Sequence, residues 1–307
     1  MSKPFFIFIV SFFLLLALFS GGMTLTLADQ LLASMGLVVL VGVPHGAIDN
    51  VIFLKQHKVS SFSFYSFYLS AVAINVMLWI YFPVLAAAFF LLISAYHFGQ
   101  SQFSHYQFES RLNYTLYFSW GASILSGMLL FNQADLKELL AQAEGFETLS
   151  YLLSENVIAS ITLGSTLIAL GILIFKTIKL QLELEKLFFE VIILGLLLLA
   201  FYLFPLLIGF TLYFVILHSL KVLEEEFQFV QKLYKKPVDL FAFGKLLFPF
   251  TFFAVLGMVF IFALTYFDYL PNFSFGFLLL ILISSITLPH AVVMERFYRL
   301  DQKPTGI

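Results

Sequence analysis

The sequence predicts an all-α protein, a polytopic bundle of about ten transmembrane helices, and two observations lead to this fold class. Of the 307 residues, 61% are hydrophobic and only 11% are charged, whereas a soluble domain carries roughly a quarter charged residues. Long apolar runs recur along the whole chain, each of about the length that crosses a bilayer as a helix. Cysteine is absent, which excludes disulfides, thiolate metal ligands, iron–sulfur clusters and cysteine nucleophiles.

The apolar runs predict ten spans within one integral-membrane domain over residues 1–307. The spans are expected near residues 5–20, 29–48, 66–82, 84–99, 113–131, 157–177, 187–204, 206–222, 246–268 and 275–294. Pro83 and Pro205 divide two stretches that are too long for single spans, and each proline suits the start of the following helix. The first run also fits a signal peptide, but Ser20-Gly21-Gly22-Met23 is a poor cleavage site, so we expect a retained helix.

The distribution of basic residues predicts the orientation of the bundle. With the N-terminus in the cytoplasm, every lysine and arginine of the chain except Lys137 falls in an inside segment. Basic loops are retained in the cytoplasm during insertion, so we expect both termini to be cytoplasmic and the protein to lie in the cell (inner) membrane. Residues 223–245 are expected to form a charged amphipathic segment on the membrane surface. Nothing in the sequence resembles a basic stripe or a nucleic-acid-binding module, so nucleic acid is not an expected partner.

Four histidines stand near the ends of four of these runs. Their motifs are Pro44-His45-Gly46-Ala47-Ile48-Asp49, Tyr96-His97-Phe98-Gly99, His218-Ser219 and Pro289-His290. The four spans run in the same direction, and each histidine follows the expected start of its span by a similar number of residues, a descent of roughly 20 to 24 Å at 1.5 Å per residue. The four rings are therefore expected at one depth, where they can converge if the helices are neighbours. Ionisable groups at membrane depth are usually functional, whereas His57 and His105 fall in loops and are expected to be solvated.

This arrangement favours a metal site. Neutral imidazole is a good ligand for Fe, Cu, Zn and Ni, and four imidazoles around an octahedral Fe(II) ion would leave two positions for dioxygen and a substrate. A ligating histidine usually donates its second N–H to a carboxylate or carbonyl, and Asp49 is the main candidate for that partner. Gln100, Gln102, Glu224 and Glu225 are weaker candidates. Tyr96, Phe98, Gly46 and Gly99, which neighbour two of the histidines, are candidate substrate-lining residues.

Two other functions use the same residue types. A bis-histidine haem b electron carrier would use two pairs of histidines, but such proteins place their haems at different depths, whereas these four histidines share one. A divalent-metal transporter would favour carboxylates near the centre of the bilayer and broken helices along a path.

The four histidine motifs resemble those of the Brp/Blh family of membrane-embedded beta-carotene 15,15′-dioxygenases, and the resemblance extends from the second span to the last. It implies oxidative cleavage of the central double bond of a carotenoid by dioxygen at an Fe(2+) ion, with retinal as the product. Carried over to this chain, the catalytic iron ligands are His45, His97, His218 and His290. The partners implied are a carotenoid, dioxygen and membrane lipid, with a functional link to a rhodopsin through retinal.

Overall fold

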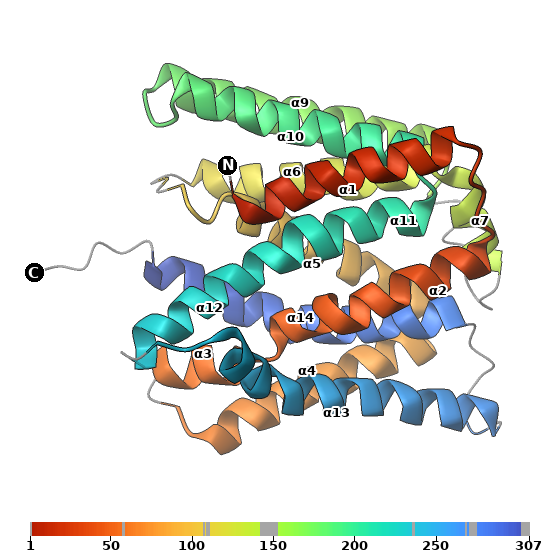
Figure 1. Ribbon diagram of the computed structural model, residues 1–307, viewed down its shortest axis with the longest axis vertical. Helices are drawn as coiled ribbons and strands as arrows, with labels where there is room; N and C mark the ends of the chain where they lie inside the picture. Colours follow the sequence, from red (N-terminus) through yellow and green to blue (C-terminus); the bar gives the residue numbers. More distant parts are fainter. Residues whose placement is uncertain are drawn as a thin grey trace, which may run out of the picture.

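The computed structural model describes residues 2–56, 59–106, 108, 111–141, 153–234, 237–267, 269 and 275–301, and across these ranges the chain is helical without a strand (Figure 1). Within these ranges, ten helical segments are long and apolar enough to cross a membrane, which confirms the predicted count. The elements are α1 (Lys3–Ser20), α2 (Leu27–Leu37), η1 (Val38–Gly42), η2 (Val43–Gly46), α3 (Asp49–Gln56), α4 (Ser61–Tyr81), α5 (Pro83–Gln102), α6 (Leu112–Phe131), α7 (Gln133–Ala141), α9 (Glu155–Ile178), α10 (Leu184–Leu203), α11 (Leu206–Thr211), η3 (Leu212–Ser219), α12 (Leu220–Tyr234), α13 (Leu240–Tyr266) and α14 (Phe275–Asp301).

Local sequence signals set several of these boundaries. Thr26 begins α2 with a capping box, in which its hydroxyl accepts from the backbone N–H of Asp29 and the Asp29 carboxylate accepts from the Thr26 backbone. Pro83 is the first residue of α5, where its missing N–H is not needed. Pro205 directly precedes α11. The two prolines therefore divide the long apolar stretches where the sequence predicts.

The second and eighth spans are irregular, which the sequence does not predict. In the second, α2 passes into the π-helical segment η1, then into the 3-10 segment η2, before α3 begins. In the eighth, the π-helical segment η3 separates α11 from α12. π-Helical turns inside α-helices are frequently found at functional sites, and each of these two segments lies at a histidine motif.

The expectation of a membrane-surface segment over residues 223–245 is wrong for its first half. The helix α12 continues the eighth span to Tyr234 instead of turning onto the surface (Figure 1). Its apolar stripe explains this, because Val222 and Val230 pack with Val293 and Phe297 of α14 in one buried cluster. The stripe is therefore covered by the bundle itself.

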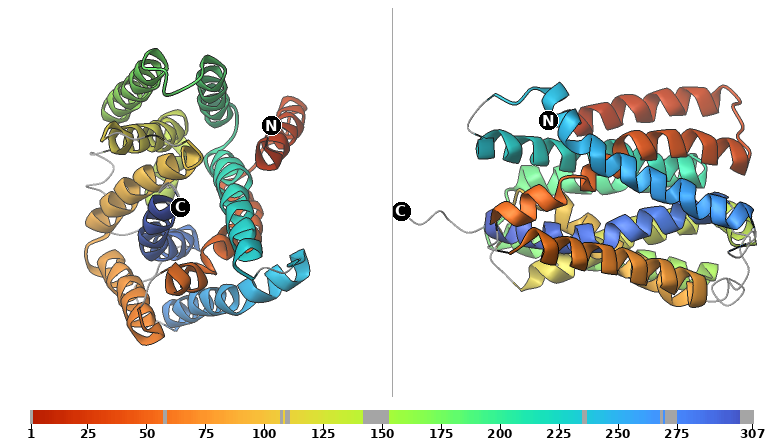
Figure 2. Two further views of the ribbon diagram at one scale, coloured as in Figure 1. Left: turned by 90° about the vertical axis from the view of Figure 1, so that its left-hand side faces the viewer. Right: turned by 90° about the horizontal axis from the view of Figure 1, so that it is seen from below.

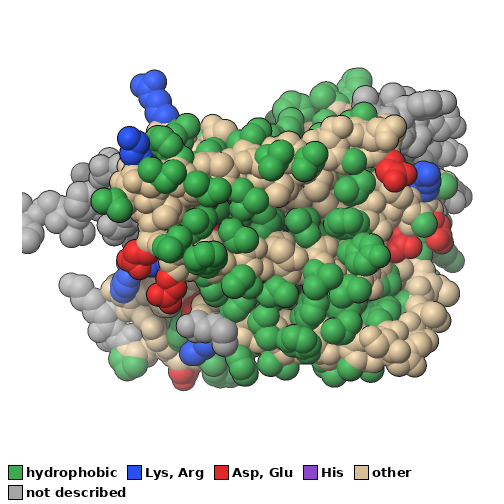
Figure 3. Space-filling model, turned by 90° about the horizontal axis from the view of Figure 1, so that it is seen from above, with side chains coloured by type: hydrophobic (Ala, Val, Ile, Leu, Met, Phe, Trp, Pro, Cys, Tyr) green, Lys and Arg blue, Asp and Glu red, His purple; other side chains and the backbone are tan. Residues whose placement is uncertain are grey.

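The last helix occupies the centre of the bundle, as the view along the helices shows (Figure 2). Buried residues make up 78% of the apolar window of α14, against 17% for α4 and 6% for α13. On the face drawn in Figure 3, apolar side chains fill the middle and charged side chains gather at the two ends, as expected for a membrane protein. The start of α1 and the end of α14 lie at the same end of the bundle (Figure 1), which agrees with an even number of spans.

Candidate metal centre

The four histidines of the sequence motifs come together in one buried cluster. His45 is in η2, His97 on α5, His218 in η3 and His290 on α14, and all four side chains are buried. The ring centroid of His45 lies 4.8 Å from that of His290 and 5.4 Å from that of His218. His97 lies 5.1 Å from both His218 and His290. Four spans that are far apart in sequence thus place their imidazoles at a common depth.

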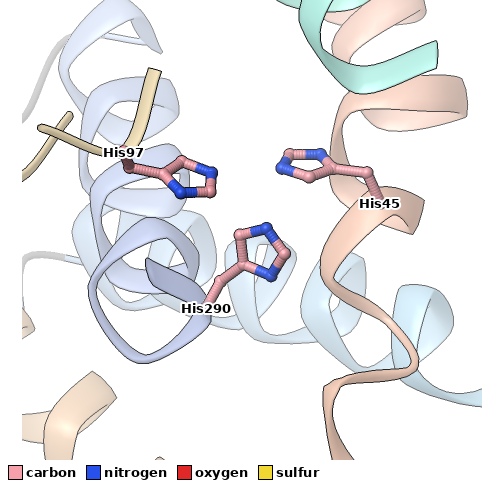
Figure 4. A group of neighbouring side chains, drawn as sticks. All are labelled: His45, His97 and His290. Atoms are coloured by element: carbon pink, nitrogen blue, oxygen red, sulfur yellow. The ribbon is translucent and has the colours of Figure 1, made fainter. Parts of the chain in front are cut away.

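Three of these rings form a group with the spacing of metal ligands. His45, His97 and His290 each offer a ring nitrogen, and the three nitrogens lie within 4.8 Å of one another. Figure 4 shows the rings approaching a common central space from three different helices. His218 contacts this group at the ring distances given above but is not part of the closest triad. It packs against Phe98, at 4.8 Å between ring centroids, and stacks on Phe214.

The hydrogen bonds of two histidines fix which nitrogen is left free. His290 donates its Nδ1–H to the Oδ1 of Asp49 at 2.8 Å, and the Oδ2 of Asp49 accepts from the hydroxyl of Tyr68 at 3.0 Å. The Nδ1 of His45 contacts the carbonyl oxygen of Gly42, three residues earlier. Each ring therefore carries its proton on Nδ1 and keeps a lone pair on Nε2, as in histidines that bind metals.

Several ring nitrogens have no hydrogen-bond partner among the described residues. These are both nitrogens of His97, the Nε2 of His218 and the Nε2 of His290. Leaving a buried polar atom unpaired costs about 1–3 kcal/mol, so a cluster of such atoms facing one another needs an explanation. A metal ion at their centre would pair with one nitrogen of each ring, and the donor set, neutral imidazole nitrogens, suits iron, copper, zinc or nickel. The residues present therefore fit a transition-metal ion.

The backbone around the cluster explains how such short motifs aim their side chains. Pro44 and Pro289 directly precede His45 and His290, and each proline lacks the N–H that would bond to the preceding turn. Next to them, Gly46 admits α14, because a Cβ there would lie 3.2 Å from Ile286 and 3.4 Å from the ring of His290. Gly99 admits α6, since a Cβ there would overlap the backbone carbonyl of Tyr117. Both glycines thus allow helices to approach closely beside the histidines.

A family model described as beta-carotene 15,15′-dioxygenase matches residues 36–298, a stretch that contains all four histidine motifs. The chain belongs to this family. Membership identifies it as a carotenoid dioxygenase, an enzyme whose substrates are a carotenoid and dioxygen. Neither the search of curated proteins nor the search of solved structures finds a match to the chain.

The four residues predicted to line the substrate site do not all lie beside the same cavity. Phe98 lines an apolar cavity together with residues of α2, α11 and α14, and Gly46 lines another between α4, α13 and α14. Tyr96 instead donates its hydroxyl to Glu295 at 2.7 Å and lines a polar pocket at the end of α14. The space beside Gly99 is filled by α6. Tyr96 and Gly99 therefore contact protein rather than the two apolar cavities.

Three of the four weaker candidates for a hydrogen bond to a histidine bind other residues, and the role of the fourth, Glu224, stays a prediction. Gln100 donates to Glu295, Gln102 donates to Glu190 at 2.8 Å, and Glu225 accepts from Ser104 at 2.9 Å. Of the two loop histidines, His105 is exposed, as expected, and His57 lies outside the described residues.

Tyr68 is the main residue near the site that sequence reasoning missed. It lies on α4, which carries no histidine motif, and its hydroxyl reaches Asp49 from a different part of the chain. A tyrosine in an apolar run resembles the aromatic residues that gather at membrane interfaces, so no sequence signal distinguishes it. Asp49 also holds the distant His290 rather than its neighbour His45, a pairing that only the fold determines.

Proposed function

We propose that this chain cleaves the central double bond of beta-carotene to give two molecules of retinal, at an Fe(II) ion bound by His45, His97, His218 and His290, in the cell inner membrane. The observation that carries the proposal is the buried cluster of four imidazoles, three of which have a ring nitrogen without a hydrogen-bond partner among the described residues. Family membership supports the carotenoid and the oxygen chemistry, and retinal as the product gives the functional link to a rhodopsin.

The overall reaction balances without an added reductant. Dioxygen adds one oxygen atom to each carbon of the double bond, the bond breaks, and two aldehyde groups result. No proton has to be removed from the hydrocarbon, so the reaction needs no general base. Iron, when bound, supplies the activation of dioxygen.

The residues of the chain hold and orient the ligands. Asp49 and Tyr68 fix the ring of His290, and the Gly42 carbonyl fixes that of His45. Four neutral imidazoles leave the ion its full positive charge. The apolar residues around the cluster exclude water, so the dioxygen chemistry is protected from side reactions.

The haem alternative fits the geometry poorly. A bis-histidine haem needs a flat porphyrin between two imidazoles, yet the four rings pack against one another with centroids about 5 Å apart. The cavity beside His45 measures only about 10 Å³. A sharp Soret band in the purified protein would nevertheless favour haem over this proposal, and metal uptake into sealed vesicles would favour a transporter.

Expression in a bacterium that makes beta-carotene tests the reaction. We expect the orange colour to be lost and retinal to accumulate, and we expect the purified protein to contain one iron per chain. His45→Ala, His97→Ala, His218→Ala and His290→Ala should each abolish both iron binding and cleavage. His105→Ala, which removes an exposed histidine, is the control and should retain both.

His218 decides between a site of four ligands and a site of three. If iron is held by the closest triad alone, His218→Ala will keep its iron while the other three variants lose theirs. Iron content measured on the purified variants separates these outcomes even where all four lose activity. Retained colour and no retinal in the wild-type strain, with the protein present and loaded with iron, would contradict the proposed reaction.

A further inference from the structure

Two apolar cavities lie near the histidine cluster, and the larger is between α4, α13 and α14. It measures about 290 Å³ and includes Gly46 and Asp49 of the site at its inner end. At its outer end, Leu69 and Phe253 line it with 65% and 66% of their surfaces exposed. Its outer walls, α4 and α13, are the two least enclosed of the ten spans. An apolar molecule in the bilayer can therefore reach this cavity sideways.

The smaller cavity lies on the opposite side of α14, between α2, α5, α6 and α11. It measures about 150 Å³, and its lining includes Trp79, Ala87 and Phe98. Among the described residues its walls are almost entirely apolar, with Ser34 as the single polar residue apart from the tryptophan. Ser34 is itself engaged, because its hydroxyl donates to the carbonyl of Leu207. The described lining of this cavity therefore suits an apolar ligand.

A third and very small cavity of about 10 Å³, called the gap here, is lined by His45, Gly42, Phe214 and Thr287. The gap shares Val43 and Ile286 with the larger cavity. It shares Val38 and Ile283 with the smaller one. The gap therefore adjoins both cavities, and it lies between η1 and α14, directly beside a candidate iron ligand.

The volumes indicate that each cavity takes one part of a long molecule. Binding sites for drug-sized ligands measure about 300–1,000 Å³, so the larger cavity is at the bottom of that range and the smaller one is below it. A rigid polyene of forty carbons needs more room than either cavity offers. Together, and joined at the gap, the two could hold its two halves with the middle of the chain beside His45.

Resting on the proposed function, we infer that the two cavities bind the two halves of one carotenoid, and that the gap lined by Val38, Val43, Ile283 and Ile286 positions its central double bond at the metal. The position of cleavage is then set by how far each half can enter its cavity. Side-chain movement at the gap, where branched residues face each other from η1, η2 and α14, admits the polyene.

Plugging each cavity separately tests this inference. Gly257→Phe fills the larger cavity, because Gly257 lines it and a Cβ there meets nothing within 4 Å. Gly244→Phe is its matched control, since Gly244 is also on α13, also faces open space and lines none of the described cavities. Ala87→Phe fills the smaller cavity, and Ala88→Phe, at the exposed neighbouring position, is its control.

Binding is measured on metal-free protein, so the readout does not depend on turnover. The chain has two tryptophans, and in a Trp120→Phe background Trp79, which lines the smaller cavity, is the only one. Quenching of its fluorescence reports binding of beta-carotene, which spans both cavities, or of retinol, which has half the length. Thermal unfolding of each variant shows that it is folded.

Each plug should weaken beta-carotene binding at least tenfold relative to its control while retinol binding changes less than threefold. A protein with both plugs should lose retinol as well. Unchanged beta-carotene binding in either folded plug variant would overturn the inference, and so would a single plug that abolishes retinol binding. Iron binding and colour loss in the wild type test the proposed function separately. The proposed function and the inference about the two cavities can therefore fail independently.

Discussion

Replacing Gly121 with alanine should disturb the metal centre without touching it, because Gly121 lies where α6 crosses α5. A Cβ on Gly121 would lie 2.8 Å from the Cα of Ala95 and closer still to its carbonyl. Ordinary contacts of a Cβ are 3.4 Å or longer, so the two helices would have to separate by roughly an ångström, the kind of backbone shift that overpacking forces. Gly99 makes the reciprocal close contact with Tyr117.

The displacement acts on His97, which lies between Ala95 and Gly99 on α5. A misplacement of about 1 Å in a catalytic constellation can cost roughly 10²-fold in rate. Overpacking itself costs typically about 1–3 kcal/mol of stability. We therefore expect Gly121→Ala to reduce retinal formation about 100-fold and to lower the midpoint of thermal unfolding.

Retinal is quantified by chromatography on membranes with equal amounts of protein, and iron is measured on the purified variant. Gly164→Ala is the matched control, because Gly164 is also in a membrane-spanning helix and a Cβ there meets nothing within 4 Å. That variant should keep full activity. If Gly121→Ala shows the same rate and the same unfolding midpoint as Gly164→Ala, the tight crossing does not hold His97 in place and the reasoning is refuted.

Three further outcomes are expected. Asp49→Asn should lower iron affinity and turnover about 10- to 100-fold, because an amide holds the Nδ1–H of His290 less strongly than a carboxylate does. Tyr68→Phe, which removes the hydrogen bond from the Tyr68 hydroxyl to Asp49, should also lower iron affinity and turnover, but by less than Asp49→Asn does. A larger loss of iron affinity in Tyr68→Phe would contradict this order. A chelator should abolish turnover of the purified enzyme, and Fe(II) should restore it whereas Zn(II), which has no redox chemistry, should not.

The sequence predicts the ten spans and the four histidines because both depend on local patterns. An apolar run of about 20 residues has few alternatives to a membrane helix, and Pro83 begins its helix where its ring is tolerated. The common depth of the histidines follows from counting residues along spans that run in the same direction. Counting does not show whether those four spans lie next to one another in the bundle. The histidine cluster was therefore only a hypothesis before the fold was known.

The parts that the sequence could not predict depend on packing between distant segments. The bond between Asp49 and His290 joins residues 241 positions apart in the chain. The extension of α12 depends on whether Val222 and Val230 find a covering surface, which α14 provides. An amphipathic pattern alone fits both a helix on the membrane surface and one packed on a neighbour.

The π-helical segments η1 and η3 show how the two irregular spans depend on each other. Gly42 ends η1, and a Cβ there would lie 2.8 Å from the ring of Phe214, which is in η3. Phe214 in turn contacts the rings of both His45 and His218, at 5.6 and 5.9 Å between centroids. The absence of a side chain at Gly42 therefore makes room for the ring of Phe214, which contacts both His45 and His218. A helical periodicity of 3.6 residues cannot reveal this contact.

A double substitution tests this coupling. Gly42→Ala should push the Phe214 ring onto the histidines and lower iron binding, whereas adding Phe214→Leu, a smaller side chain, should restore part of the loss. Since residues in contact are energetically coupled by about 0.5–3 kcal/mol, the rescue should be visible as a recovery in iron affinity of at least a few-fold. A double variant that is no better than Gly42→Ala alone would show that the two segments are positioned independently, because removing the ring would then relieve nothing.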